Sequence, residues 1–329
     1  MRATRFRLLA VPMLAILLVA AAGCSKKTTT TSSPTSAPSF AAGTTMARLQ
    51  AAGKMKVGTK FDQNLFGLKN PLTGSIEGFD VEMAKIVAQG IFGGTLDDAA
   101  RHIEFVETPS NVREISIQEG KVDMVAATYT INATRKQVVD FAGPYYVSGQ
   151  DIMVKKDDNS IKSVTDLNGK KVCSVQGSTS LTNVKAKAPQ ADLSITFDLY
   201  SKCAEALKDG RVQAETTDAG ILLGLVKDNK DIFKLVGNPF TTEPYGIGMK
   251  KGDDAFRSFI NDRIEGSYRD GSLAAAFNRT VGAAGVPAPT PPPVDRYTSV
   301  PATPTSTVTA TPTSTVTATP TSTVTATSK

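Results

Sequence analysis

The sequence has little of the chemistry that common enzyme classes require. It contains one histidine, His102, and three cysteines, and it has no G-x-S-x-G segment. A serine hydrolase needs a histidine beside its nucleophile, and a zinc site needs a cluster of cysteine and histidine ligands. We therefore expect His102 to be a surface residue. We expect the chain not to be an enzyme, and to use no metal and no other cofactor.

The chain also lacks a strong excess of one charge and a long apolar run beyond its first residues. Removing residues 1–23 takes away three of the 37 basic residues and none of the 31 acidic ones, so the formal charge falls from +6 to +3. Nucleic-acid binding would call for a basic patch with interleaved aromatic residues, which is absent. We expect no nucleic-acid partner, and a mature protein that is soluble and monomeric.

The first residues resemble an export signal. Three arginines precede an apolar run of 15 residues, Leu8–Ala22, which is shorter than the roughly 20 residues of a spanning helix. The run ends in the sequence A-A-G-C at Cys24, which resembles a lipobox. We predict a lipoprotein signal peptide over residues 1–23, with Cys24 acylated. The protein would then be exported and anchored to the outer face of the cell membrane; an ordinary secretory signal is the alternative.

Two further segments cannot build a core. Residues 24–45 are rich in Ser, Thr and Pro, and residues 286–329 are proline-rich and then repetitive. Within the latter, the sequence Ala-Thr-Pro-Thr-Ser-Thr-Val-Thr occurs three times between Ala302 and Thr325. Because neither segment offers apolar surface to bury, we predict a disordered spacer and a disordered tail.

Between these segments, strands and helices alternate twice. Apolar runs predict strands at 56–59, 103–106, 122–127, 151–155, 171–175, 193–197, 212–216 and 246–250. Helices are predicted from an Asp80 cap, from an Asn111/Glu114 capping box, near 179–188, around Cys203 behind a Ser201 cap, and over 219–227 and 254–264. The alternation is typical of two α/β units with sheets covered by helices.

One polar loop stands out as a carboxylate receptor. Thr128 and Thr130 follow an apolar strand, and Asn132 is a good N-cap for a helical turn that carries Arg135. A guanidinium fork behind hydroxyls and free backbone N–H groups suits a carboxylate. A solvated Arg135 is the alternative.

Other polar residues stand at element ends. The Gly177–Ser180 turn could supply more donors through Ser178 and Thr179, or simply cap a helix. Asp218 lies where a strand meets a helix, and could hold an ammonium or act as an N-cap. Asp62 is a weaker candidate for the ammonium.

The stretch D-M-V-A-A-T-Y-T-I-N-A-T-R-K-Q-V-V-D-F-A-G-P-Y-Y from Asp123 resembles the family 3 solute-binding proteins of amino-acid ABC importers. Segments in the same order agree, at 57–60 (V-G-T-K), 78–81 (G-F-D-V), 166–172 (D-L-N-G-K-K-V) and 243–248 (E-P-Y-G-I-G). Together they cover roughly residues 50–296, and the nearest likeness is to actinobacterial glutamate-binding lipoproteins. The resemblance implies an α/β two-lobe, periplasmic-binding-protein-like (type II) fold. Its lobes would be 46–145 with 245–285, and 146–244, joined by two hinge segments near 145–149 and 241–245.

The resemblance also implies roles for single residues. Arg135 with Thr128 and Thr130 would hold the α-carboxylate of an amino acid, and Asp218 its ammonium. Basic residues at Lys60 and Arg113 would hold a side-chain carboxylate, so glutamate is favoured, with aspartate as a second ligand. The remaining expected contacts are Ser110, Ser178, Thr179 and Tyr200. ABC permease subunits would be the protein partner.

Three alternatives stay open. The ligand could be glutamine or another polar amino acid. The protein could be a lyase or transglycosylase on the same fold, with Glu215 or Asp218 as its acid. Cys173 and Cys203, the pair left after Cys24, are expected to form a disulfide, a pairing that the resemblance supports, or else to remain two buried thiols.

Overall fold

The computed structural model describes residues 38–297, and the structural statements below concern that part of the chain. The predicted signal peptide, Cys24, most of the predicted spacer and the repeat lie outside the described residues. Within residues 38–297, no helix is long and apolar enough to span a membrane. The same residues contain no group of three His, Cys, Asp or Glu side chains placed to hold a metal ion.

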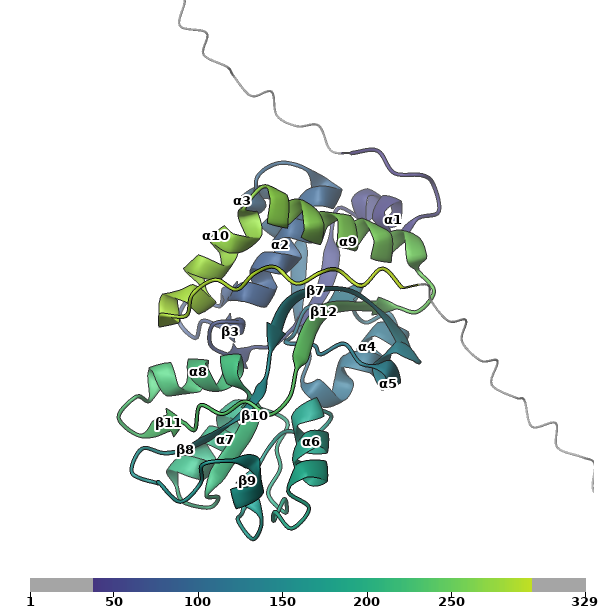
Figure 1. Ribbon diagram of the computed structural model, residues 1–329. Helices are drawn as coiled ribbons and strands as arrows, with labels where there is room; N and C mark the ends of the chain where they lie inside the picture. The colour runs from purple at the N-terminus through teal and green to yellow at the C-terminus, as the bar shows by residue number, and fades with distance from the viewer. Residues whose placement is uncertain (1–37, 298–329) are drawn as a thin grey trace, which may run out of the picture. The chain divides into compact units, whose positions relative to one another are not determined.

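A five-stranded sheet organises the first lobe (Figure 1). Its strands in spatial order are β5 (Ile103–Glu107), β1 (Met55–Thr59), β6 (Met124–Val125), β12 (Glu243–Lys250) and β7 (Val139–Ser148). β5, β1 and β6 are parallel, whereas β12 runs antiparallel to β6 and β7. Every predicted strand of this sheet is present, although the one predicted at 122–127 pairs over only two residues.

Helices cover this sheet and bury the positions that their spacing predicts. The helices of the first lobe are α1 (Thr45–Ala52), α2 (Phe79–Phe92), α3 (Leu96–Ala100), α4 (Arg113–Gln118), α5 (Ala133–Lys136), α9 (Asp254–Arg269) and α10 (Ser272–Arg279), with short 3-10 turns η1 (Ser110–Val112) and η3 (Val281–Ala284). In α2, Val81, Ala84, Val87 and Ile91 are all fully buried. The apolar face therefore decides where α2 packs.

A small antiparallel sheet, absent from the sequence-based prediction, follows β1. It consists of β2 (Asp62–Gln63), β3 (Gly67–Lys69) and β4 (Ile76–Glu77). Phe66, between β2 and β3, is fully buried against the rings of Phe79 and Tyr245. This anchor fixes the position of β2 directly after the end of β1.

A four-stranded sheet organises the second lobe. Its order is β11 (Phe233–Leu235), β8 (Gln150–Lys155), β10 (Ala214–Asp218) and β9 (Val172–Cys173). Its helices are α6 (Thr179–Lys187), α7 (Tyr200–Lys208) and α8 (Ala219–Asp228), with the 3-10 turn η2 (Val164–Leu167). β10 begins and ends two residues later than predicted, and Asp218 is its last residue.

The strand predicted at 193–197 is wrong. Only two isolated bridges form there, between Lys171 and Asp192 and between Val175 and Phe197. The Asp192 carboxylate accepts a 3.0 Å hydrogen bond from the backbone of Ser194, which favours a local turn over strand pairing.

Two segments cross between the sheets side by side. β7 passes through Gly149 into β8, and the chain returns just before β12. The backbone N–H of Gln150 donates to Thr241 Oγ1 at 2.9 Å, and Phe240 donates back to the carbonyl of Gln150. The two predicted hinge segments thus lie at the paired ends of β7 and β12 (Figure 1).

Three predicted helix caps are wrong. Gly78 stands at the cap of α2, and the Asp80 carboxylate instead accepts from the Thr128 N–H and the Tyr145 hydroxyl. The predicted Asn111/Glu114 box is replaced by η1, so α4 begins only at Arg113. α7 begins at Tyr200, which places Ser201 in its first turn. Asn132, by contrast, caps α5 as predicted, because its side chain accepts from the Arg135 N–H.

The predicted disulfide between Cys173 and Cys203 is confirmed. It joins β9 to α7 with the two Cα atoms 5.5 Å apart, and both cysteines are fully buried. The bond lies in an apolar cluster with Met153, Val175 and Tyr200. It therefore fixes α7 on the second sheet.

The chain beyond α10 returns across the first lobe. We predicted a disordered tail from residue 286, but residues 286–297 are described and bonded along β7 and α9 (Figure 1). Asp295 N–H donates to the carbonyl of Gly143, and Arg257 donates to the Tyr297 carbonyl. The Tyr297 ring lies between the Lys136 and Arg257 cations, with its centroid 3.8 and 4.3 Å from them.

Candidate functional site

Arg135 is buried rather than solvated. It sits on α5, just behind the Asn132 cap, and is 7% exposed. Its guanidinium donates to the carbonyls of Thr130 (2.7 Å) and Gly177 (3.1 Å), and pairs with Glu114 at 3.2 Å. Because Gly177 belongs to the second lobe, Arg135 bridges the two lobes.

A second arginine stacks beside it. The guanidinium carbons of Arg113 and Arg135 lie 4.3 and 4.9 Å from the centroid of the buried Tyr129 ring. Arg113 is 2% exposed and donates to the carbonyl of Ala127 at 2.9 Å, while its Nε has no partner among the described residues. One aromatic ring thus holds two cations near each other, and such stacking on the ring face is favourable.

Lys60 adds a third buried cation. It follows β1, is 2% exposed, and its Nζ donates to Ser110 Oγ at 2.9 Å. Burial, and then the charge of Arg113, lower the pKa of Lys60 to about 7. Within the described residues, neither Lys60 nor Arg113 lies within ion-pair distance of a carboxylate.

Asp218 provides a buried acid in the second lobe. It stands at the N-cap position of α8, but its side chain makes no capping hydrogen bond, so the capping alternative does not account for it. Its Oδ2 accepts from the Tyr245 hydroxyl at 2.6 Å, and its Oδ1 has no described partner. Burial, and then the charge of Glu243, raise the pKa of Asp218 to about 7, against the effect of Arg135 and Arg113.

The two threonines before α5 contribute different polar groups to the first lobe. Thr128 has a left-handed backbone (φ 44°), which is costly for a β-branched residue. Its hydroxyl hydrogen bonds with Gln63 Oε1 (3.0 Å) and the Ala127 carbonyl, so it is engaged within the first lobe. Thr130 contributes its carbonyl to Arg135, as described above.

The second-lobe hydroxyls are also engaged. Ser178 caps α6, accepting from the Leu181 N–H at 3.0 Å and donating to the Val175 carbonyl. Thr179 Oγ1 donates to Glu243 at 2.8 Å, and the Tyr200 hydroxyl lies 3.5 Å from Ser180 Oγ. Ser178 therefore caps α6, and this capping does not exclude a binding role for the turn.

Three buried polar residues near the site were not among the predicted site residues. Gln63 is 2% exposed, and its Nε2 has no described partner. Asp80 holds the backbone of Thr128, and Glu243 binds Thr179, Asn183 and Thr241. Each stands at or next to the end of an element, and the contacts of its side chain depend on segments distant in the sequence, so three-dimensional proximity reveals them.

A groove leads to this cluster. It has a volume of about 820 Å³ and is bordered by four of the predicted contacts, namely Thr130, Arg135, Ser178 and Thr179. Lys60, Arg113 and Asp218 do not line it; they lie deeper and are almost completely buried. Lys60, Arg113, Arg135 and Asp218 thus form a buried charged cluster, here called the chamber, and the groove borders it at Arg135.

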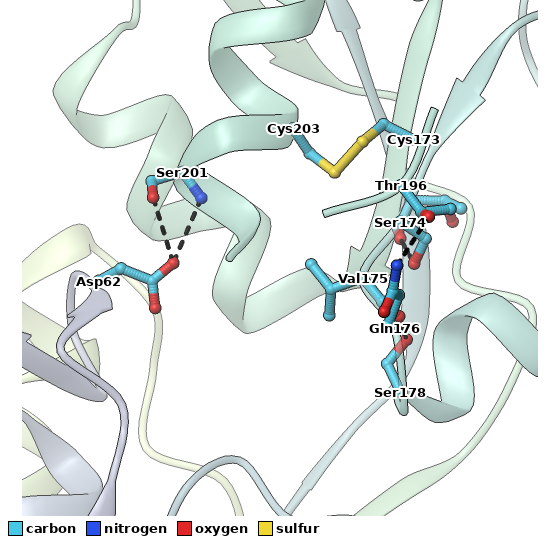
Figure 2. Close-up of a disulfide and its surroundings, with 10 residues drawn as sticks. Asp62, Cys173, Ser174, Val175, Gln176, Ser178, Thr196, Ser201 and Cys203 are labelled. Atoms are coloured by element: carbon cyan, nitrogen blue, oxygen red, sulfur yellow. Dashed lines mark hydrogen bonds between the residues drawn. A yellow bond between two sulfur atoms is a disulfide. The ribbon is translucent and has the colours of Figure 1, made fainter. Parts of the chain in front are cut away.

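Asp62, the weaker ammonium candidate, points elsewhere. Its carboxylate accepts from the backbone N–H and the hydroxyl of Ser201, both at 3.3 Å (Figure 2). The side chain is thus turned toward the start of α7.

Residues 55–283 match the family described as bacterial extracellular solute-binding proteins, family 3. The chain belongs to this family. It is 43% identical over 238 residues to the glutamate-binding protein GluB of Corynebacterium glutamicum, covering 70% of this chain and 79% of GluB. It is 41% identical over 238 residues to the ABC transporter glutamine-binding protein GlnH of Bacillus subtilis, covering 72% of this chain and 84% of GlnH.

A solved structure agrees. An ancestral arginine-binding protein bound to arginine is 38% identical, with a TM-score of 0.63, and the match covers 69% of this chain and 98% of that one. This solute-binding protein is therefore the binding component of an amino-acid ABC transporter, built on the two-lobe α/β fold. The similar proteins named here are binding proteins for glutamate, glutamine and arginine, and the family is described as extracellular.

Proposed function

We propose that this solute-binding protein captures an acidic amino acid, glutamate ahead of aspartate, and delivers it to its permease. The observation that carries the proposal is the pair of buried cations, Lys60 and Arg113, that have no described carboxylate within ion-pair distance. A buried charge without a counter-charge is costly. A second carboxylate on the ligand would supply that counter-charge.

The rest of the chamber suits the common part of an amino acid. Arg135 and the backbone N–H groups near Thr130 and Ser178 would receive the α-carboxylate. Asp218, with an unpartnered oxygen, would accept from the ammonium. Ser110 and Tyr200 would complete the wall, through Lys60 and Ser180 respectively.

Capture would proceed by lobe closure. We infer lobes of residues 46–145 with 245–285, and of residues 146–244, in a monomer anchored through Cys24. Arg135 and Lys60 lie on the first lobe and Asp218 on the second, so one ligand molecule contacts both only when they are closed. A ligand with such differential contacts stabilises the closed state.

Calorimetric titration of the ligand-stripped protein tests the proposed ligand. The relatives GluB and GlnH are almost equally similar, so identity alone does not favour glutamate over glutamine. We expect a dissociation constant for glutamate about 30-fold or more below that for glutamine, because glutamine leaves a desolvated cation unpaired. Equal affinity for the two would contradict the proposal.

A lyase-like reaction with Glu215 as its acid finds no support in the geometry. Glu215 pairs in register with Cys173 and Met153 and is fully buried, with both carboxylate oxygens unpartnered among the described residues. Burial, and then the charge of Asp62, raise the pKa of Glu215, and the residue does not line the groove. Incubation with glutamate, aspartate and glutamine should therefore return each of them unchanged.

A further inference from the structure

Helix α7 has no N-cap of its own. The residue at its cap position is Leu199, an apolar residue whose side chain makes no capping hydrogen bond. The first backbone N–H groups of a helix need an acceptor, and Ser, Thr, Asp or Asn at the cap normally supplies it. The start of this nine-residue helix therefore depends on an acceptor from elsewhere in the chain.

That acceptor comes from the other lobe. Asp62, on β2, accepts from the backbone N–H of Ser201 and from its hydroxyl, both at 3.3 Å and both through Oδ2 (Figure 2). The two residues are 139 positions apart in the sequence. A carboxylate at a helix N-terminus also interacts favourably with the helix dipole. Asp62 thus accepts the hydrogen bonds that an N-cap would accept, but it belongs to the first lobe.

Both ends of this contact are held in place. Asp62 follows Lys60 by two residues and is fixed by the pairing of β2 with β3. On the other side, the Cys173–Cys203 disulfide lies within one turn of Ser201 and fixes α7 to the second sheet (Figure 2). Neither end can follow the other when the lobes separate, so the contact must break on opening.

A second polar contact spans the lobes nearby. Asn64 Nδ2 donates to both carboxylate oxygens of Asp228 on α8, at 2.7 and 2.8 Å. Next to it, a Cβ placed on Gly224 would lie 2.5 Å from the Asn64 carbonyl, so the lobes approach closely here. The segment 62–64 is thus a line of contact between the first lobe and helices α7 and α8.

We propose that Asp62 is a positioning residue that caps α7 across the lobes in the closed state alone. Ligand capture then completes the helix, and the completed helix slows ligand release. The proposal rests on lobe closure in the proposed function, but it does not depend on which amino acid is bound.

The test compares Asp62→Ala with Asp198→Ala in the full chain. Asp198 is the matched control, because it lies next to the same helix end but pairs with Lys202 on its own lobe, at 2.8 Å. We expect Asp62→Ala to raise the dissociation constant for glutamate about three- to tenfold, chiefly through faster dissociation. The ligand-free melting temperature should stay at the wild-type value. Asp198→Ala should leave the dissociation constant unchanged.

Hydrogen exchange at the Ser201 amide provides the second readout. In the wild type, saturating glutamate should slow this exchange, and in Asp62→Ala it should not. Protection of the amide without ligand, or a lower ligand-free melting temperature in Asp62→Ala, would show a permanent structural cap and overturn the proposal. If wild-type titration favours glutamine, the glutamate assignment fails separately, and the same comparison is made with glutamine.

Discussion

Arg113 is the residue whose removal should change selectivity. Arg113→Met deletes a buried cation that has no carboxylate partner in the described part of the chain. The side-chain carboxylate of glutamate then loses its counter-charge, whereas glutamine has no such carboxylate to lose it. We expect glutamate affinity to fall about 30-fold or more, and the ratio of glutamate to glutamine affinity to narrow. Titration of both amino acids measures this ratio.

Two further variants serve as controls for Arg113→Met. Arg135→Met should weaken the binding of both amino acids, since Arg135 is assigned to the α-carboxylate that both carry. Lys121→Met removes the same charge from an exposed side chain paired with Glu119, and should change neither affinity. An unchanged ratio in Arg113→Met would contradict the role assigned to Arg113.

The pKa values at Lys60 and Asp218 predict how glutamate affinity depends on pH. Both are shifted to about 7, Lys60 downward and Asp218 upward, mainly by burial. Above pH 7, Lys60 loses its charge and a carboxylate is held less well. Below pH 7, Asp218 becomes neutral and the ammonium is held less well. Affinity should therefore peak near pH 7.

Titrations between pH 5 and pH 9 measure this profile. For one linked proton, affinity changes by about tenfold per pH unit beyond the pKa. Lys60→Met should remove the loss of glutamate affinity above pH 7 and leave the loss below pH 7 unchanged. Asp218→Asn should reduce the loss of affinity below pH 7. The acid side keeps a contribution from Asp80, whose pKa burial raises to about 6. A flat wild-type profile would count against both assignments.

At this scale, the sequence predicted the charged residues of the chamber but not how they are engaged. Arg135, Asp218 and Lys60 stand at the ends of elements, where a strand or helix pattern locates them. Whether a hydroxyl is engaged elsewhere depends on neighbours distant in sequence, as Thr128 with Gln63 and Thr179 with Glu243 show. No periodic pattern carries that information.

Among the elements, the disulfide between β9 and α7 should contribute strongly to stability. Replacing Cys173 and Cys203 together with serine opens a loop with a sequence separation of 30 residues. The chain-entropy relation gives a loss of about 3–4 kcal/mol in the free energy of unfolding. Urea unfolding of exported protein measures this loss, and non-reducing peptide mapping of the wild type should recover the cross-linked pair. Two alkylatable thiols in the exported protein would contradict the bond.

Elements with a clear apolar period were predictable, and those defined by contacts with distant segments were not. α2 and α8 follow their apolar faces, and the predicted strand at 56–59 lies within β1. The short strands β2, β3 and β4 pair only because Phe66 is anchored in the core. The cap of α7 comes from Asp62, 139 positions away, whereas the local sequence pattern predicted Ser201 as the cap.

For the whole molecule, ligand should make the particle more compact. Contacts across the lobes, such as Arg135 with Gly177, exist only in a closed arrangement. Small-angle scattering should show a smaller radius of gyration at saturating glutamate than in the stripped protein. Gly224→Val is a useful comparison, because a larger side chain facing the Asn64 carbonyl should hinder full closure. Identical scattering with and without a bound amino acid would contradict lobe closure.

The two ends of the described chain meet the same helix. Near the start, the ring of Phe40 packs edge-on against Phe259 of α9, and near the end Tyr297 packs on Arg257 of that helix. Tension applied between the two terminal segments would therefore pass through α9 and also through β7, whose Gly143 carbonyl accepts from the Asp295 N–H. In the described residues both terminal segments are bonded to the first lobe, so a rotation of the second lobe would pull on neither segment.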